Sequence, residues 1–131
     1  MRCHVEFRSA LLRDPLPAIG GARVAEALRE SLPSHGFDVL AFIQEDWGVL
    51  ITLANEDFAL SIGCGHYAEY ADGHLCFIEP STPTVRRWLK KISTIETVER
   101  LASAMANILA QRSDVQHMRW WTAAEAAGKP D

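Results

Sequence analysis

Two short pairs of cysteine and histidine flank one predicted hairpin loop, and they are the residues best suited to chemistry. Cys64 and His66 precede the loop, and His74 and Cys76 follow it. Residues two apart on a strand point to the same face of a sheet. Four soft ligands could therefore meet and bind zinc if the two strands pair in a compatible register. Structural zinc sites usually contain two cysteines separated by two to four residues, and this sequence has no such pair. We therefore predict no metal and no cofactor, and we keep these four residues as the metal candidates.

A thiol nucleophile is the second chemistry that the same residues suggest. Such a site needs a positioned base, an orienting group and donors that stabilise an oxyanion. Cys64 beside His66 offers only part of that set. We therefore predict no catalytic residues and favour a protein that is not an enzyme.

The other chemically distinctive feature is an acidic block between Phe37 and Pro80. The block contains no Lys or Arg, and its formal charge is −8, whereas residues 81–131 hold eight basic and five acidic residues, a charge of +3. Its eight carboxylates belong to Asp38, Glu45, Asp46, Glu56, Asp57, Glu69, Asp72 and Glu79. Turns favour Asp and Asn in any protein, which explains part of the pattern. The lack of Lys is unusual, because sheet edges are often protected by Lys.

The expected strand order places part of this block in one patch. Alternate turns of an antiparallel meander lie at the same end of the sheet, so the turn at Glu45–Asp46 and the loop over 67–73 should be neighbours. The residues predicted to bind a partner there are Glu45, Asp46, Trp47, Glu69, Tyr70 and Asp72. Carboxylates among aromatic rings suit a basic protein partner, because charge steers the encounter and the rings supply contact area. The cationic run 86–91 could instead cover this patch.

The elements that position these residues follow from hydrophobic periodicity. Short apolar segments over 37–44, 47–54, 57–64 and 74–79 with tight links predict a four-strand antiparallel meander, and segments 3–9 and 115–122 predict one strand at each end. Apolar residues at helical spacing predict a helix from about Ala22 to Pro33 and another after a capping box at Ser93 and Glu96. Pro83–Thr84 is expected to open a short helical turn.

Together these elements predict an α+β fold of order β-α-β-β-β-β-α-β. One domain should span 1–122, with both helices on one face of the sheet, and 123–131 should be a disordered tail. The opposite face should be partly open or used for binding. Adjacent Trp120 and Trp121 on the last strand must point to opposite faces.

Composition excludes several classes of protein. A chain of 131 residues with 48% hydrophobic residues is the size and composition of one globular domain. The net charge of −4 opposes general affinity for nucleic acid or anionic membranes, so we predict neither partner. Charged residues at the N-terminus do not fit a signal peptide, and three cysteines fit free thiols, so we expect a cytoplasmic protein.

Size, acidity, expected location and α+β organisation resemble those of the small immunity proteins that bacteria use to neutralise toxins, many of them basic nucleases. The resemblance involves no sequence motif. It implies a non-enzymatic protein-binding domain whose acidic, aromatic end docks over a basic active site. An alternative is a small-molecule-binding module with an aromatic-lined cleft between sheet and helices. A homodimer is compatible with either function.

Overall fold

A computed structural model describes residues 1–15, 20–126 and 128 of the chain. The elements are β1 (Arg2–Arg8), α1 (Ala22–Ser31), the 3-10 helix η1 (Leu32–His35), β2 (Val39–Gln44), β3 (Val49–Leu53), β4 (Leu60–His66), β5 (Gly73–Glu79), β6 (Thr84–Arg87), β7 (Lys90–Ser93), α2 (Ile95–Ala110), β8 (Gln116–Thr122) and α3 (Ala123–Ala126).

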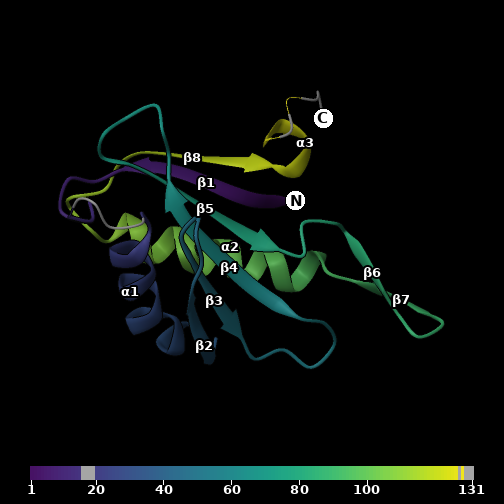
Figure 1. The fold of residues 1–131 in the computed structure, drawn as a ribbon. Coiled ribbons are helices and arrows are strands. Elements are labelled where there is room, and N and C mark those ends of the chain that lie inside the picture. Colours follow the sequence, from purple (N-terminus) through teal and green to yellow (C-terminus); the bar gives the residue numbers. More distant parts are fainter. Residues whose placement is uncertain (16–19, 127, 129–131) are drawn as a thin grey trace.

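Six of these strands form one antiparallel sheet in the order β2-β3-β4-β5-β1-β8 (Figure 1). Strands β2 to β5 are the predicted meander, and β1 and β8 extend it beyond β5. The predicted α+β fold class is therefore confirmed. The sheet carries β1 in its interior, beside β5, which a strand-by-strand interpretation of the sequence does not specify.

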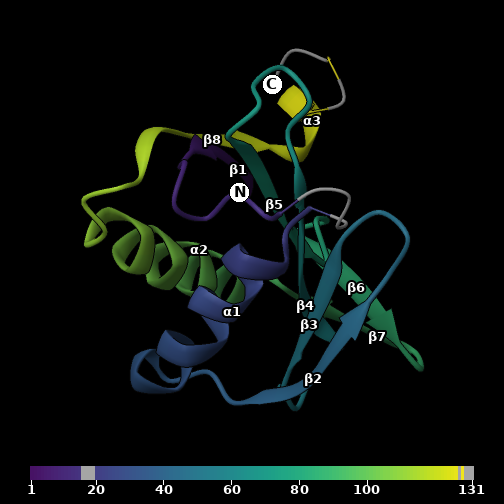
Figure 2. The same ribbon diagram turned by 60° about the vertical axis from the view of Figure 1, so that its left-hand side comes forward.

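Both long helices pack on the same face of the sheet (Figure 2), because each has one apolar side. Helix α1 contacts β3 and β4, and α2 contacts β1 and β5. The residues that α2 buries recur at helical spacing, as its sequence predicts: Val98, Leu101, Ala102, Ala104, Met105, Ile108 and Leu109. The hydrophobic core lies between these helices and the sheet, and we call this side the covered face.

The start of α1 explains the glycine pair at 20–21. Gly21 has φ 95°, a left-handed conformation that favours glycine, and a Cβ atom there would lie 2.1 Å from the Cys64 carbonyl oxygen of β4. The Asp14 carboxylate accepts hydrogen bonds from the backbone N–H of Gly21 (2.9 Å) and Arg23 (3.0 Å). Asp14 is thereby tied to the start of α1, where Gly21 lies against the Cys64 carbonyl of β4.

Two local predictions are wrong. The expected helical turn at Pro83–Thr84 is instead the start of the β6–β7 hairpin, a separate two-stranded sheet. The capping box at Ser93 does not form, because Ser93 belongs to β7 and the residue before α2 is Thr94. The Thr94 hydroxyl donates to the Thr82 carbonyl across the base of the hairpin and does not cap the helix.

The predicted disordered tail begins as the short helix α3. Thr122 and Glu125 form a capping box: the Thr122 N–H donates to the Glu125 carboxylate (3.0 Å), and the Glu125 N–H donates to the Thr122 hydroxyl (3.2 Å). Residues 127 and 129–131 of that tail lie outside the described residues. Within the described part of the chain, no helix is long and apolar enough to cross a membrane.

Candidate functional site: the open face of the sheet

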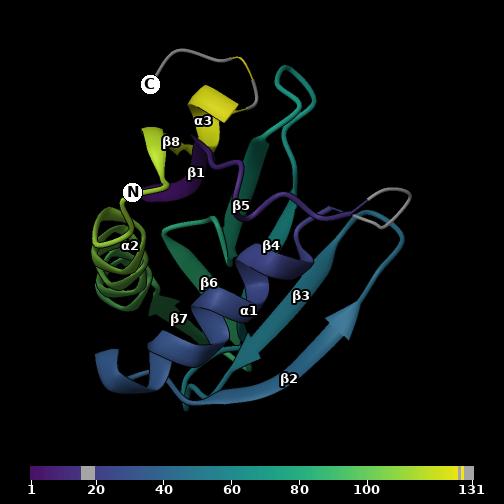
Figure 3. The same cartoon turned by 90° about the vertical axis from the view of Figure 1, so that its left-hand side faces the viewer.

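The face of the sheet opposite the helices carries one continuous row of apolar and aromatic residues. Strand register places six residues side by side, one from each strand, and we call them the transverse row: Ile43, Leu50, Gly63, Phe77, His4 and Trp121. Side chains directly opposite on neighbouring strands lie close enough to contact one another. Figure 3 shows α1 and α2 on the same side of the strongly twisted sheet. The transverse row lies on the other side, which we call the open face.

Phe77 lies at the centre of the row and covers Gly63. A Cβ atom at Gly63 would lie 2.1 Å from the Phe77 ring, so only glycine lets that ring lie flat across β4. Trp47, from the turn between β2 and β3, lies 5.3 Å from Phe77 between ring centroids, and His4 of β1 lies 6.1 Å from it. Aromatic rings at these separations attract one another. Together with Trp47, which is 44% exposed, the row therefore forms a packed aromatic surface that solvent still reaches.

A hollow opens where the row meets β1, β8 and the loop between β4 and β5. Its volume is about 460 Å³, and an adjoining cavity of about 280 Å³ shares Glu6, Tyr67 and Trp121 with it. The Trp121 indole N–H donates to the Glu6 carboxylate (3.2 Å), which fixes one wall. Arg119 stacks on Trp121, with 4.0 Å between its guanidinium carbon and the ring centroid. The hollow thus combines aromatic walls with charges of both signs.

Tyr67 couples the two sides of this hollow. Its hydroxyl donates to the Glu69 carboxylate (3.3 Å), and Glu6 of β1 faces it. Reduced hydration and these two carboxylates raise the pKa of the Tyr67 phenol to about 12. The phenol therefore remains a hydrogen-bond donor at any physiological pH.

The residues of the predicted acidic patch lie in two separate turns. Glu45, Asp46 and Trp47 lie between β2 and β3, and the other three lie between β4 and β5. Figures 2 and 3 show these turns as distinct tips at one end of the sheet. Trp47 reaches from the first turn to Phe77.

The second turn, in the 67–72 loop, contacts Arg8, a cation that lies outside the acidic block. Arg8 of β1 forms an ion pair with Asp72 (2.9 Å) and stacks on Tyr70, 4.3 Å from the ring centroid. This contact lowers the pKa of Asp72. Glu69 contacts Tyr67 instead. The two turns therefore differ: the Glu45–Asp46 turn lies beside an exposed indole, and the 67–72 loop is partly neutralised.

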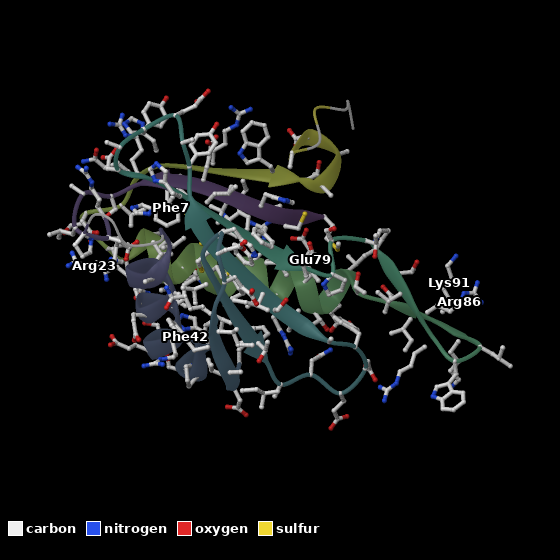
Figure 4. All side chains as sticks on the ribbon, in the orientation of Figure 1. Phe7, Arg23, Phe42, Glu79, Arg86 and Lys91 are labelled. Atoms are coloured by element: carbon white, nitrogen blue, oxygen red, sulfur yellow. The ribbon has the colours of Figure 1, made fainter. Side chains whose placement is uncertain are left out.

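The cationic run 86–91 belongs to the β6–β7 hairpin at the other end of the sheet. Arg87 donates from Nη1 to the backbone carbonyls of Glu56 (2.7 Å) and Asp57 (3.3 Å), in the turn between β3 and β4. Figure 4 shows Arg86 and Lys91 on the protruding hairpin, away from the β4–β5 loop. Arg87 therefore contacts the far turn of the acidic block, and the hairpin leaves the predicted patch uncovered.

The cysteine and histidine candidates lie directly opposite one another on β4 and β5. Cys64 pairs with Cys76, their sulfur atoms 3.6 Å apart, and His66 pairs with His74. His74 is buried and bonds through Nε2 to the Ser9 carbonyl (2.9 Å), whereas His66 is exposed. Among the described residues, no group of three or more His, Cys, Asp or Glu side chains is placed to hold a metal ion.

Burial makes the thiols of Cys64 and Cys76 poor nucleophiles. Both lie fully buried on the covered face. The hydrogen bond that the Cys64 thiol shares with Cys76, together with burial, raises the pKa of Cys64 well above its usual value. Because thiolate is the reactive form, a raised pKa suppresses its reactivity.

Glu6, Arg8 and Arg119 are not among the predicted site residues, and the sequence did not indicate that Tyr67 and Trp121 line one hollow. Alternation along β1 could have indicated one polar face, since Cys3, Val5 and Phe7 alternate with His4, Glu6 and Arg8. The pairing of β1 with both β5 and β8 was the missing information. Trp120 and Trp121 do point to opposite faces, opposite Val5 and His4 respectively.

Comparisons with protein-family models, curated proteins and solved structures find no match to this chain.

Proposed function

We propose that this chain is a non-enzymatic domain that binds a basic protein through the open face of its sheet. The transverse row is the observation that carries the proposal. With six strands about 4.8 Å apart, the row extends over about 24 Å, which is the scale of a specific protein interface. Ile43 is 41% exposed and Trp47 44% exposed, so apolar contact area is available at the β2 end of the row and beside Phe77.

Charge around the row favours a basic partner. Glu45 and Asp46 adjoin Trp47, and Glu69 and Glu79 lie on the loop and strand beside the row. A rim of this sign attracts a cationic surface and raises its association rate, while the rings supply contact area once it has docked. This arrangement is what the resemblance to immunity proteins implies, and an inhibitor of a basic toxin is the form of the function that we favour.

Site-specific photocrosslinking tests the proposal in the native host. A photoreactive phenylalanine analogue at Trp47 should crosslink to one protein, and the same analogue at Glu30, exposed on α1, should not. The captured protein is then purified and its affinity measured by calorimetry. Leu50→Asp, in the middle of the row, should weaken binding by about tenfold or more, because it places an unpaired charge in a desolvated interface.

Charge reversal tests whether the acidic residues beside the row act locally or only through the net charge of the protein. Glu45→Lys with Asp46→Lys should slow association and reduce its dependence on salt, whereas Glu30→Lys on the helix side should change neither by a comparable factor. Affinity that is unaffected by Leu50→Asp would show that the partner binds elsewhere. Crosslinking of a second copy of this chain in place of another protein would show a homodimer.

The hollow beside Tyr67 supports a second candidate, a small-molecule site. Its volume of about 460 Å³ and its mixture of aromatic walls with Glu6 and Arg119 are those of a small-ligand pocket. A metabolite that binds there should change the fluorescence of Trp121. The change should disappear in Trp121→Phe and persist in Trp88→Phe, which alters an indole far from the hollow.

A further inference from the structure

The β6–β7 hairpin is the part of the molecule that the open face does not explain. It forms its own two-stranded sheet and projects beyond the end of the main sheet (Figure 1). The two residues at its tip, Trp88 and Leu89, are 91% and 94% exposed. These are the most exposed large apolar side chains among the described residues.

Three features of the hairpin oppose its stability in water. Trp88 has φ 59°, a left-handed conformation that favours Gly or Asn. Strand register places Arg86 opposite Lys91 and Arg87 opposite Lys90, so like charges lie directly across from one another. Two large apolar side chains occupy a turn that is otherwise best made of small polar residues. Such conflicts between sequence and local structure concentrate at functional sites.

The cations surround the tip. From Ser81 to Ile95 the chain has four basic residues and no acidic one. Residues directly opposite share a face of the hairpin, so Arg86 and Lys91 lie on one face and Arg87 and Lys90 on the other. Figure 4 shows Arg86 and Lys91 together on the hairpin. Hydrogen bonds from Arg87, next to the tip, tie β6 to the β3–β4 turn, and the Thr94 N–H donates to the Pro83 carbonyl (2.9 Å) at the base of the hairpin.

We propose that the hairpin inserts its tip end-on into an anionic membrane surface. Trp88 and Leu89 would enter the interfacial layer, and the four cations behind them would meet lipid phosphates, which relieves the repulsion within each cross-strand pair. A convex tip with cations on both faces fits a deformable surface into which it can insert, whereas a flat acidic protein surface would engage only one face. This inference is independent of the proposed function of the open face.

The negative charge of the whole chain does not oppose this contact. Charges act on a membrane within about 10 Å at physiological salt, so the local cations near the tip determine the interaction. The net charge of −4, from which sequence analysis predicted no membrane partner, averages this positive hairpin with an acidic block. The structure separates the hairpin from most of that block.

Flotation with lipid vesicles tests the proposal. The protein should float with vesicles of phosphatidylcholine mixed with phosphatidylglycerol at low salt, and it should not float with phosphatidylcholine alone or at high salt. Lys90→Gln with Lys91→Gln should reduce partitioning by roughly 30-fold, about fivefold for each cation removed. Arg13→Gln with Arg23→Gln, which changes the net charge equally at exposed sites away from the hairpin, should change partitioning far less.

The tip is tested by a variant that cannot weaken the turn. Trp88→Asn replaces the indole with a residue that the left-handed position favours, so the hairpin remains folded while partitioning falls by about tenfold. Brominated lipids should quench fluorescence in the wild-type protein more than in Trp88→Asn. The proposal is overturned if the protein does not float with anionic vesicles, or if Trp88→Asn floats as well as the wild type. The first outcome would exclude an anionic membrane as the ligand of the hairpin, and the second would leave charge attraction alone without insertion of the tip.

Discussion

The two faces of the sheet are made from the same strands but differ in exposure and in the kinds of side chain that they carry. On β1, Cys3, Val5 and Phe7 are at most 1% exposed beneath the helices, whereas the alternate residues of that strand remain partly accessible. The covered face excludes water, which is the largest favourable contribution to folding. The open face holds aromatic rings, carboxylates and guanidinium groups that the core does not need.

This difference shows where function can reside. Polar groups on the covered face are held by internal bonds, as His74 is by the Ser9 carbonyl. Polar groups on the open face contact one another across strands and still reach solvent, as Glu6 and Trp121 do. A substitution on the covered face should therefore change stability first, and one on the open face should change binding first.

Two isoleucines give the largest expected contrast. Ile62 is fully buried on the covered face, and Ile43 is 41% exposed on the open face. Ile62→Ala should lower the free energy of unfolding by about 2–5 kcal/mol, because it removes buried methyl groups and leaves a cavity. Ile43→Ala should lower it by less than about 1 kcal/mol. Urea unfolding followed by circular dichroism measures both, and equal losses would contradict the assignment of the two faces.

Gly63 tests whether the open face is itself packed. Gly63→Ala should lower the free energy of unfolding by about 1–3 kcal/mol, because its methyl group would overlap the Phe77 ring. Gly65→Ala on the same strand is the milder comparison and should cost less, since a Cβ atom there would lie 3.2 Å from the Trp47 carbonyl oxygen, a tight contact and not an overlap. In the double variant Gly63→Ala, Phe77→Ala the two losses should not add, because removing the ring removes the overlap. Additive losses would show that the ring does not cover Gly63.

The contrast also explains which parts of the fold the sequence could predict. The helices and the β2–β5 meander depend on local signals, namely apolar spacing and tight turns, and these predictions are confirmed. The position of β1 beside β5 depends on pairing between residues more than 60 positions apart, such as Phe7 with His74, which has no local signal. The partnership of Arg8 with Asp72 depends on that pairing and was missed for the same reason.

The β6–β7 hairpin was missed because its turn lacks the usual residues. A two-residue hairpin turn is normally recognised by Asn-Gly or a similar pair, and here the tip is Trp88–Leu89. The two turns of the predicted acidic patch lie at one end of the sheet, but the sequence does not show that Arg8 of β1 pairs with Asp72 in one of them. Candidate sites on a sheet therefore need the strand order as well as the sequence.

Acid should destabilise the covered face in a specific range of pH. Burial lowers the pKa of His74 below its usual value of 6.5. The unfolded chain therefore binds a proton that the folded one does not, so stability is fully present above about pH 6.5 and falls as the pH decreases below it. His74→Gln, which can still donate to Ser9, should reduce the dependence of the urea midpoint on pH between pH 7 and pH 5. Burial also lowers the pKa of His4, so His4→Gln should remove a further part of the slope. A slope that is unchanged in both variants would assign it to another group. The lowered pKa values of Asp72, Glu99 and Asp114 act only at more acidic pH, below 4.5 for Glu99 and below 3.8 for the two aspartates.

The smallest effect is a titration on the open face that leaves the fold intact. In Tyr70→Phe, the chain keeps Tyr67 as its one tyrosine, and its phenol should ionise at a pKa of about 12. Glu6→Gln should lower this pKa toward 10.0, because a neighbouring carboxylate disfavours the phenolate and the amide does not. Near-ultraviolet absorbance follows ionisation, and far-ultraviolet circular dichroism checks that the protein stays folded. Glu30→Gln, on the helix side, should not move the midpoint. An unchanged midpoint in Glu6→Gln would mean that the 67–72 loop does not close over β1, and the hollow proposed for small molecules would lose its wall.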